Sequence, residues 1–127
     1  MKYRNIGLSG IKASVVGLGS WAIGGWNWGG TNEPEAIKAI HASLDAGINL
    51  IDTAPAYGLG LSEEIIGKAI AGRRDKVLIA NKCGLVWHTQ KGEYFFDEKD
   101  KPVYRYLGKE SIRYEIEQSL NLLKTDY

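Results

Sequence analysis

Three short, mostly apolar segments alternate along the chain with segments of helical periodicity. The apolar segments are residues 15–19, 49–52 and 77–80, and glycine or polar residues bound each of them. Strands that alternate with helices favour parallel pairing with right-handed crossovers. A strand that is apolar throughout, such as residues 77–80, is typical of a parallel sheet covered on both faces. The sequence therefore predicts an α/β fold whose strands all end at the same edge of one sheet.

The helical segments carry their own start signals and apolar faces. Thr31 or Asn32 can cap the first helix, and Ser62 is a cap candidate for the second. The third helix is expected over residues 109–124. Apolar residues at helical spacing predict that it packs on the sheet through one stripe. The stripe consists of Ile112, Ile116, Leu120 and Leu123.

Two further segments complete the expected organisation. The turn signal at residues 7–10 predicts a hairpin at about residues 3–15. The polar stretch of residues 84–108 is expected to be a loop, with a ribbon around residues 94–96. The whole chain, residues 1–127, is then one domain. Its expected βα units lie at about residues 16–46, 49–71 and 77–124.

Composition excludes several classes of protein. Sixteen basic and fifteen acidic residues give a net charge of +1, so bulk charge does not predict a nucleic acid or a membrane surface as partner. No apolar run reaches the roughly 18 residues of a membrane span. The single cysteine, Cys83, fits a reducing compartment, and we expect a cytoplasmic protein. Two histidines and one cysteine at unrelated positions do not predict a metal site.

Residues 17–22, Gly-Leu-Gly-Ser-Trp-Ala, match a dinucleotide-binding fingerprint. That motif requires a helix directly after the strand, because the helix N-terminus holds the pyrophosphate. Here four glycines and two tryptophans follow in residues 23–30, which disfavours a helix. The interpretation that these glycines only allow a tight turn at the strand end is therefore preferred.

Asp52 closes the second expected strand, and Lys82 closes the third. Neighbouring strands lie about 4.8 Å apart, so the two side chains can form an ion pair at the carboxyl edge of the sheet. Tyr57 can lean over this pair from the loop after Asp52. Active sites of parallel α/β folds lie at this edge.

A cation beside a phenol stabilises the phenolate, so Lys82 would make Tyr57 a better proton donor. The three residues could then protonate a carbonyl oxygen, with Asp52 orienting Lys82. The alternative is a structural ion pair beside an ordinary loop aromatic, and the residues alone favour neither interpretation.

Several motifs in combination resemble the aldo-keto reductase family. The chain resembles the N-terminal part of the sequences of that family. The resemblance is carried by the opening hairpin and by residues 17–21, 52–58, 62–63, 79–84 and 119–127. The resemblance implies a (β/α)₈ barrel of the TIM-barrel type with a hairpin across its bottom. A closed barrel of this kind takes eight βα units and about 250 residues, so this chain is expected to hold the hairpin and about three units.

The resemblance also implies roles for individual residues. Tyr57 would be the general acid, Lys82 its activating partner, and Asp52 the residue paired with Lys82 near the nicotinamide ribose. Ser20 and Trp21 would border the nicotinamide of NADPH. The implied activity is NADPH-dependent reduction of small aldehydes and ketones without a metal. The substrate mouth would be lined by Trp26, Trp28, Trp87 and His88.

The family's fourth catalytic residue is a histidine at the end of the fourth strand. Neither His41, on an expected helix, nor His88, in an expected loop, matches that position. The 127-residue chain alone is therefore expected to be a truncated and inactive part of such an enzyme. The alternative is a non-catalytic half-barrel module that self-associates through its open sheet edge. Cys83 is expected to be buried and inert, and His41 to be a packing or surface residue.

Overall fold

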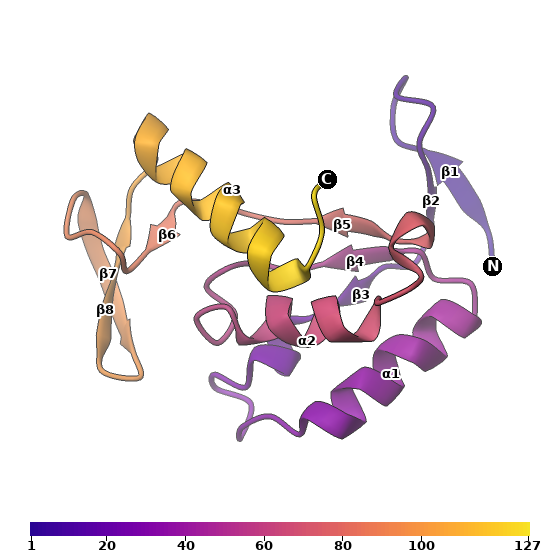
Figure 1. Cartoon of the computed structure of the whole chain (residues 1–127), viewed down its shortest axis with the longest axis horizontal. Helices are drawn as coiled ribbons and strands as arrows, with labels where there is room; N and C mark the ends of the chain where they lie inside the picture. Colours follow the sequence, from indigo (N-terminus) through magenta and orange to yellow (C-terminus); the bar gives the residue numbers. More distant parts are fainter.

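A parallel three-stranded sheet forms the centre of the molecule (Figure 1). The computed structural model describes all residues, 1–127. The strands are β3 (Leu18–Gly19), β4 (Leu50–Asp52) and β5 (Leu78–Ala80), in the order β3-β4-β5. Their register places Gly19, Asp52 and Ala80 side by side at the carboxyl edge. The predicted parallel α/β arrangement is confirmed.

Three helices accompany the sheet, with α2 in contact with both of the others. They are α1 (Glu33–Asp45), α2 (Leu61–Ala69) and α3 (Lys109–Leu123). Two short 3₁₀ turns, η1 (Trp21–Gly24) and η2 (Arg74–Lys76), follow β3 and precede β5. None of the helices has the length and apolar character that crossing a membrane requires.

The helix starts agree with the sequence at α1 and differ at α2. Asn32 caps α1, and its side chain accepts a hydrogen bond from the Glu35 backbone N–H (3.2 Å). The prediction that Ser62 caps α2 is wrong, because the residue at the cap position is Gly60, two residues earlier, in the left-handed region (φ 97°). Ser62 is instead a fully buried residue whose hydroxyl donates to Ser20 Oγ.

The opening hairpin lies where the turn signal predicts it. It consists of β1 (Tyr3–Asn5) and β2 (Lys12–Ser14), paired antiparallel. The Val15 N–H still bonds to the Lys2 carbonyl (3.0 Å), which extends the hairpin by one residue. The expectation of a buried strand over residues 15–19 is therefore wrong: Val15 and Val16 are exposed, the strand is only Leu18–Gly19, and of these Leu18 is half-buried and Gly19 exposed.

Residues 84–108 contain more regular structure than the expected loop. They form a second sheet of three antiparallel strands, β6 (Leu85–Val86), β7 (Glu93–Glu98) and β8 (Lys101–Arg105), with β8 in the middle. Lys99 and Asp100, both at positive φ, make a two-residue turn between β7 and β8. We call β6, β7 and β8 the ribbon. It projects from one end of the molecule (Figure 1).

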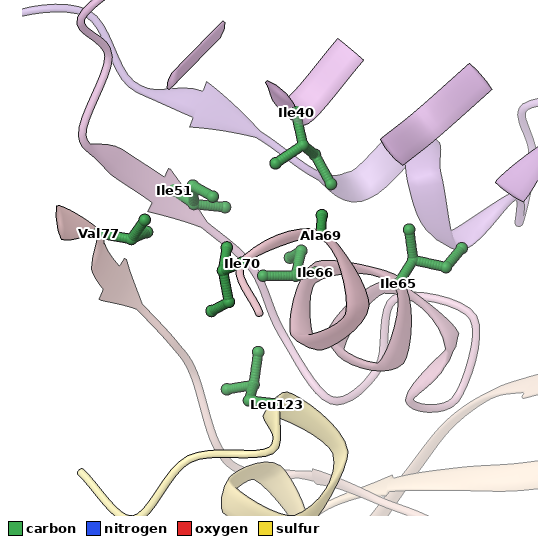
Figure 2. Packing of buried hydrophobic residues seen from close by; sticks show 8 residues of the cluster. All are labelled: Ile40, Ile51, Ile65, Ile66, Ala69, Ile70, Val77 and Leu123. Carbon is green, nitrogen blue, oxygen red and sulfur yellow. The ribbon is translucent and has the colours of Figure 1, made fainter. Parts of the chain in front are cut away.

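The main core lies between α1, α2 and the central sheet. It is built from isoleucine and other aliphatic side chains, and α2 contributes three of the eight (Figure 2). Complete burial of one such side chain contributes about 1.5–3 kcal/mol of transfer free energy. The members are Ile40, Ile51, Ile65, Ile66, Ala69, Ile70, Val77 and Leu123.

The expected apolar stripe of α3 is wrong for most of its length. Of the four stripe residues only Leu123 is buried, and Ile116 is 52% exposed. The face of α3 that is buried carries Ser111, Glu115 and Ser119 in place of aliphatic residues. The reason is a close approach of two helices: a Cβ atom on Gly67 of α2 would lie 2.5 Å from the Leu122 carbonyl oxygen.

Candidate active site

Lys82 and Asp52 form the ion pair that the strand ends predict. The Lys82 Nζ donates to both carboxylate oxygens of Asp52, at 2.7 and 2.8 Å, and to the Thr53 carbonyl at 3.0 Å. Asp52 is the last residue of β4, and Lys82 lies two residues beyond β5. Adjacent parallel strands therefore bring together two charges that are 30 residues apart in the chain.

The surroundings of Lys82 favour its charged form. Partial burial is the largest single influence and would lower the pKa of the ammonium group. The carboxylate of Asp52 and the hydroxyl of Tyr57 together outweigh burial, so the pKa of Lys82 lies above its ordinary value. Lys82 is thus a permanent cation at the carboxyl edge of the sheet.

Tyr57 leans over this ion pair from the loop between β4 and α2. Its ring centroid lies 5.0 Å from Lys82 Nζ. The ring also stacks on Trp21, with centroids 6.3 Å apart and an interplanar angle of 25°. Trp21 is exposed and begins η1, two residues after the end of β3. The phenol therefore contacts both a cation and an indole that comes from the neighbouring strand end.

The loops that carry Trp21 and Tyr57 touch through their backbones. A Cβ atom on Gly24 would lie 2.5 Å from the Tyr57 carbonyl carbon, and one on Gly58 would lie 2.3 Å from the Gly24 carbonyl oxygen. Gly58 also has a positive φ of 72°. Only glycine at both positions permits this approach, which fixes the height of Tyr57 above the sheet.

An apolar cavity of about 510 Å³ opens next to the Tyr57 ring. Trp26, one of the predicted mouth residues, stacks on Phe96 of the ribbon with ring centroids 4.6 Å apart. The turn of the ribbon is tied to the Tyr57 loop, because Lys99 Nζ donates to the Gly58 carbonyl (3.2 Å). The cavity is lined by Trp21, Trp26, Ala56, Tyr57, Leu85, Phe95 and Phe96.

The other predicted mouth residues lie elsewhere. Trp28 is exposed and meets only the edge of Trp21, at 5.9 Å and 79°. His88 packs on the ring of Tyr114 (4.3 Å) and lies 3.1 Å from the Ser111 hydroxyl, and burial lowers its pKa. Neither His88 nor Trp87 lines the cavity. The ribbon residues Leu85, Phe95 and Phe96 line the cavity where Trp28, Trp87 and His88 were expected.

Three other predicted residues are placed as follows. Ser20 is fully buried, and its hydroxyl donates to the Asp52 carbonyl (2.8 Å), so Trp21 is the exposed residue at this strand end. Cys83 is exposed, which overturns the expectation of a buried thiol, because β5 ends at Ala80 and the strand alternation does not reach it. His41 is a packing residue, with Nε2 2.8 Å from the Ala69 carbonyl.

The sequence analysis names Glu63 only as part of a family motif and gives it no role, although its side chain bonds to the residue next to Lys82. Its carboxylate is fully buried, and burial raises its pKa. Glu63 Oε1 accepts a hydrogen bond from the Asn81 side chain (2.7 Å), and Asn81 directly precedes Lys82. An acidic residue in the first turn of a helix ordinarily faces water, so the sequence carries no signal for this role.

The sequence model of the aldo/keto reductase family matches residues 15–127. The chain belongs to this family. The stated resemblance is thereby confirmed, and the dinucleotide fingerprint at residues 17–22 is part of an aldo/keto reductase sequence. Members of the family use nicotinamide cofactors, and structures solved with NADPH or NADP are among those that match.

Three known proteins illustrate the similarity. The aldo-keto reductase YhdN of Bacillus subtilis is 50% identical over 100% of this chain and 36% of its own length. The NADH-specific methylglyoxal reductase of Escherichia coli is 44% identical over 100% of this chain and 40% of its own.

The solved glycerol dehydrogenase of Gluconobacter oxydans superposes with a TM-score of 0.77 at 46% identity, over 97% of this chain and 36% of its own. The chain thus spans a little over a third of the length of these relatives. Its three βα units correspond to part of a (β/α)₈ barrel, which confirms the predicted fold class.

Proposed function

We propose that this chain carries the proton-donating part of a carbonyl reductase of the aldo/keto reductase type. The observation that carries the proposal is the position of the Lys82 ammonium between the Asp52 carboxylate (2.7 Å) and the Tyr57 ring (5.0 Å). In this arrangement Tyr57 donates its hydroxyl proton to the carbonyl oxygen of an aldehyde or ketone. Lys82 stabilises the resulting phenolate, and Asp52 keeps Lys82 in place.

The residues at the carboxyl edge fit one end of a nicotinamide cofactor. The half-exposed carboxylate of Asp52 can accept hydrogen bonds from ribose hydroxyls, and the exposed Trp21 ring offers a flat apolar wall. The bound cofactor supplies the hydride for reduction. We propose NADPH, which is bound in solved members of the family, although one 44% identical relative is named as NADH-specific.

The apolar cavity beside Tyr57 indicates the kind of carbonyl compound that fits. All seven lining residues are hydrophobic, and the only polar side-chain groups among them are the Tyr57 hydroxyl and the indole N–H groups of Trp21 and Trp26. A cavity of this composition favours an uncharged substrate with an apolar or aromatic body.

The 127 residues hold no histidine at this site, since His41 and His88 lie elsewhere. We therefore propose that the chain on its own binds cofactor and substrate but is inactive or nearly so. The test mixes the chain with NADPH and a reactive aromatic aldehyde, and records tryptophan fluorescence and NADPH absorbance. Saturable quenching that Trp21→Leu weakens is expected, with little or no NADPH oxidation, and Tyr57→Phe should abolish any oxidation that is seen.

Trp87→Leu is the matched control, because Trp87 lies outside the cavity, and it should leave both signals unchanged. NADH in place of NADPH tests the cofactor preference. Absence of both quenching and oxidation in the folded chain would overturn the proposal.

A second candidate is the half-barrel module that self-associates. Strands β3 and β5 are both edge strands of the central sheet. A groove of about 360 Å³ runs beside β5, and its apolar side chains include Ile79, Ile116 and Leu120. Sedimentation velocity should then show a defined oligomer that Ile116→Glu dissociates. A monomer at all concentrations would rule this candidate out.

A further inference from the structure

Two consecutive residues in the first turn of α2 form hydrogen bonds to residues that follow each of the three central strands, and to the loop that carries Tyr57. Ser62 and Glu63 are both fully buried, although one is polar and the other ionisable. Burial of such groups costs free energy unless they make specific hydrogen bonds. Their partners are therefore informative.

Ser62 holds the Asp52 and Tyr57 side of the site. Its hydroxyl donates to Ser20 Oγ (2.9 Å), and Ser20 Oγ donates to the Asp52 carbonyl (2.8 Å). The Thr53 hydroxyl lies 3.2 Å from the Ser62 hydroxyl, and the Ser62 backbone N–H donates to the Tyr57 carbonyl (3.1 Å). One residue thus connects the end of β3, the end of β4 and the loop of Tyr57.

Glu63 holds the Lys82 side. Its Oε1 accepts from Asn81 Nδ2 (2.7 Å), and Asn81 Oδ1 accepts from the Lys82 backbone N–H (2.9 Å). Its other oxygen, Oε2, is buried without a hydrogen-bond partner. Asn81 is therefore the partner that the carboxylate holds at short distance, and the Ser119 side chain of α3 is the other polar group that offsets the effect of burial on its pKa.

We propose that Ser62 and Glu63 are positioning residues that set the separation of Asp52, Tyr57 and Lys82. Neither touches a reacting atom, and each acts through a named intermediary, Ser20 or Asn81. The two residues are neighbours on one rigid helical turn, so the spacing between the strand ends follows the geometry of α2. This inference gains its catalytic meaning from the proposed function, but the contacts exist independently of turnover.

The experiment reads Lys82 directly by a side-chain NMR titration of the full chain, while urea unfolding records stability separately. The Asp52→Asn variant serves as the reference, because it gives the pH at which Lys82 titrates without its carboxylate partner. In Asn81→Ala, Lys82 should titrate at lower pH than in the wild type, toward the Asp52→Asn position. Amide exchange at Lys82 should accelerate by roughly three- to tenfold, as expected for the loss of one hydrogen bond.

Conservative and matched variants separate positioning from simple stabilisation. Glu63→Gln keeps an acceptor for Asn81 and should titrate like the wild type, whereas Glu63→Met should resemble Asn81→Ala. Ser62→Ala should shift Lys82 in the same direction, and Ser111→Ala, another buried serine, should not. Asn81 is exposed, so Asn81→Ala decides the question even where Glu63→Met does not fold.

A wild-type titration of Lys82 in Asn81→Ala would overturn the proposal, whatever happens to stability. Turnover is not part of this readout, so a chain without activity still tests the positioning role. Conversely, a chain whose Lys82 shifts as expected but which fails to bind NADPH would refute only the proposed function.

Discussion

Helix α2 packs on its two sides in opposite ways. Toward α1 and the sheet it presents Ile65, Ile66 and Ile70, all completely buried. Toward α3 it presents Gly67, and the buried face of α3 carries polar residues such as Glu115. The first contact is stabilised by apolar burial, and the second is a close backbone approach in which Leu123 is the only α3 side chain of the apolar core. Helix periodicity therefore predicts the first contact and cannot predict the second.

The largest effect is expected from the apolar side. Ile66→Ala removes a completely buried side chain and leaves a cavity, so it should lower the free energy of unfolding by about 3–4 kcal/mol. Ile116→Ala is the matched control on α3, where the side chain is 52% exposed, and it should change stability by less than about 0.5 kcal/mol. Urea unfolding followed by circular dichroism measures both. Equal losses would mean that α3 also packs through its apolar stripe.

The helix–helix approach should be the next most sensitive feature. Gly67→Ala places a methyl group against the Leu122 carbonyl oxygen, so α2 and α3 must separate. We expect a loss of about 2 kcal/mol, in spite of the better helix propensity of alanine. Gly19→Ala, where a Cβ meets nothing within 4 Å, should leave stability nearly unchanged in the same unfolding assay. A stabilised Gly67→Ala variant would contradict the close approach.

A smaller loss is expected when a buried hydrogen bond of the polar side is removed. Glu115 Oε2 accepts from the Gly84 backbone N–H (2.8 Å), so Glu115→Ala leaves a buried donor without a partner. Stability at pH 7 should fall by about 1 kcal/mol. Glu115→Gln keeps an acceptor at this place and should retain most of the stability. If both variants lost the same amount, the hydrogen bond to Gly84 would not be the cause.

The smallest effect is a pH dependence of stability to which the buried carboxyl groups of the polar side contribute. Burial raises the pKa of Glu63 and of Glu115 above the ordinary 4.5. The folded state then binds these protons more tightly than the unfolded state. The stability that comes from protonation of these two carboxyl groups is fully present below about pH 4.5 and is lost as the pH rises through the folded pKa values. Unfolding free energies between pH 4 and 7 should therefore depend less on pH in Glu115→Gln than in the wild type.

Glu117→Gln, on the exposed face of α3, is the control for this titration and should leave the slope unchanged. A slope that stays the same in Glu115→Gln would show that Glu115 takes no part in it. Glu98, whose pKa burial also raises, contributes with the same sign, so part of the slope should persist.

The predictable part of the molecule is the part governed by strand order and apolar burial. The parallel sheet and the ion pair of Asp52 with Lys82 follow from strands that alternate with helices, because parallel strands all end at one edge. The start of α2 and the packing of α3 do not follow, because hydrogen bonding in the folded state decides whether Ser62 or Glu115 is buried.

The walls of the site were predictable only near the strand ends. Trp21 comes two residues after the end of β3, so its place beside Tyr57 could be predicted from the chain order. Phe95 and Phe96 reach the cavity because the ribbon folds back over the Tyr57 loop, which is a long-range arrangement. Local sequence patterns indicate the ribbon but carry no information on where it docks. Trp87 and His88, close to these residues in the chain, consequently lie outside the cavity.

The glycine contact between the Trp21 and Tyr57 loops has an evolutionary consequence. Gly24 and Gly58 touch backbone to backbone, so neither can gain a side chain unless the other loop retreats. A substitution at only one of the two positions is therefore expected to disturb the loop contact and to be lost during evolution. The side chains around them, such as Trp26 and Phe95, are free to diversify. Descendants of this sequence can change what enters the cavity while the height of the phenol above the sheet stays constant.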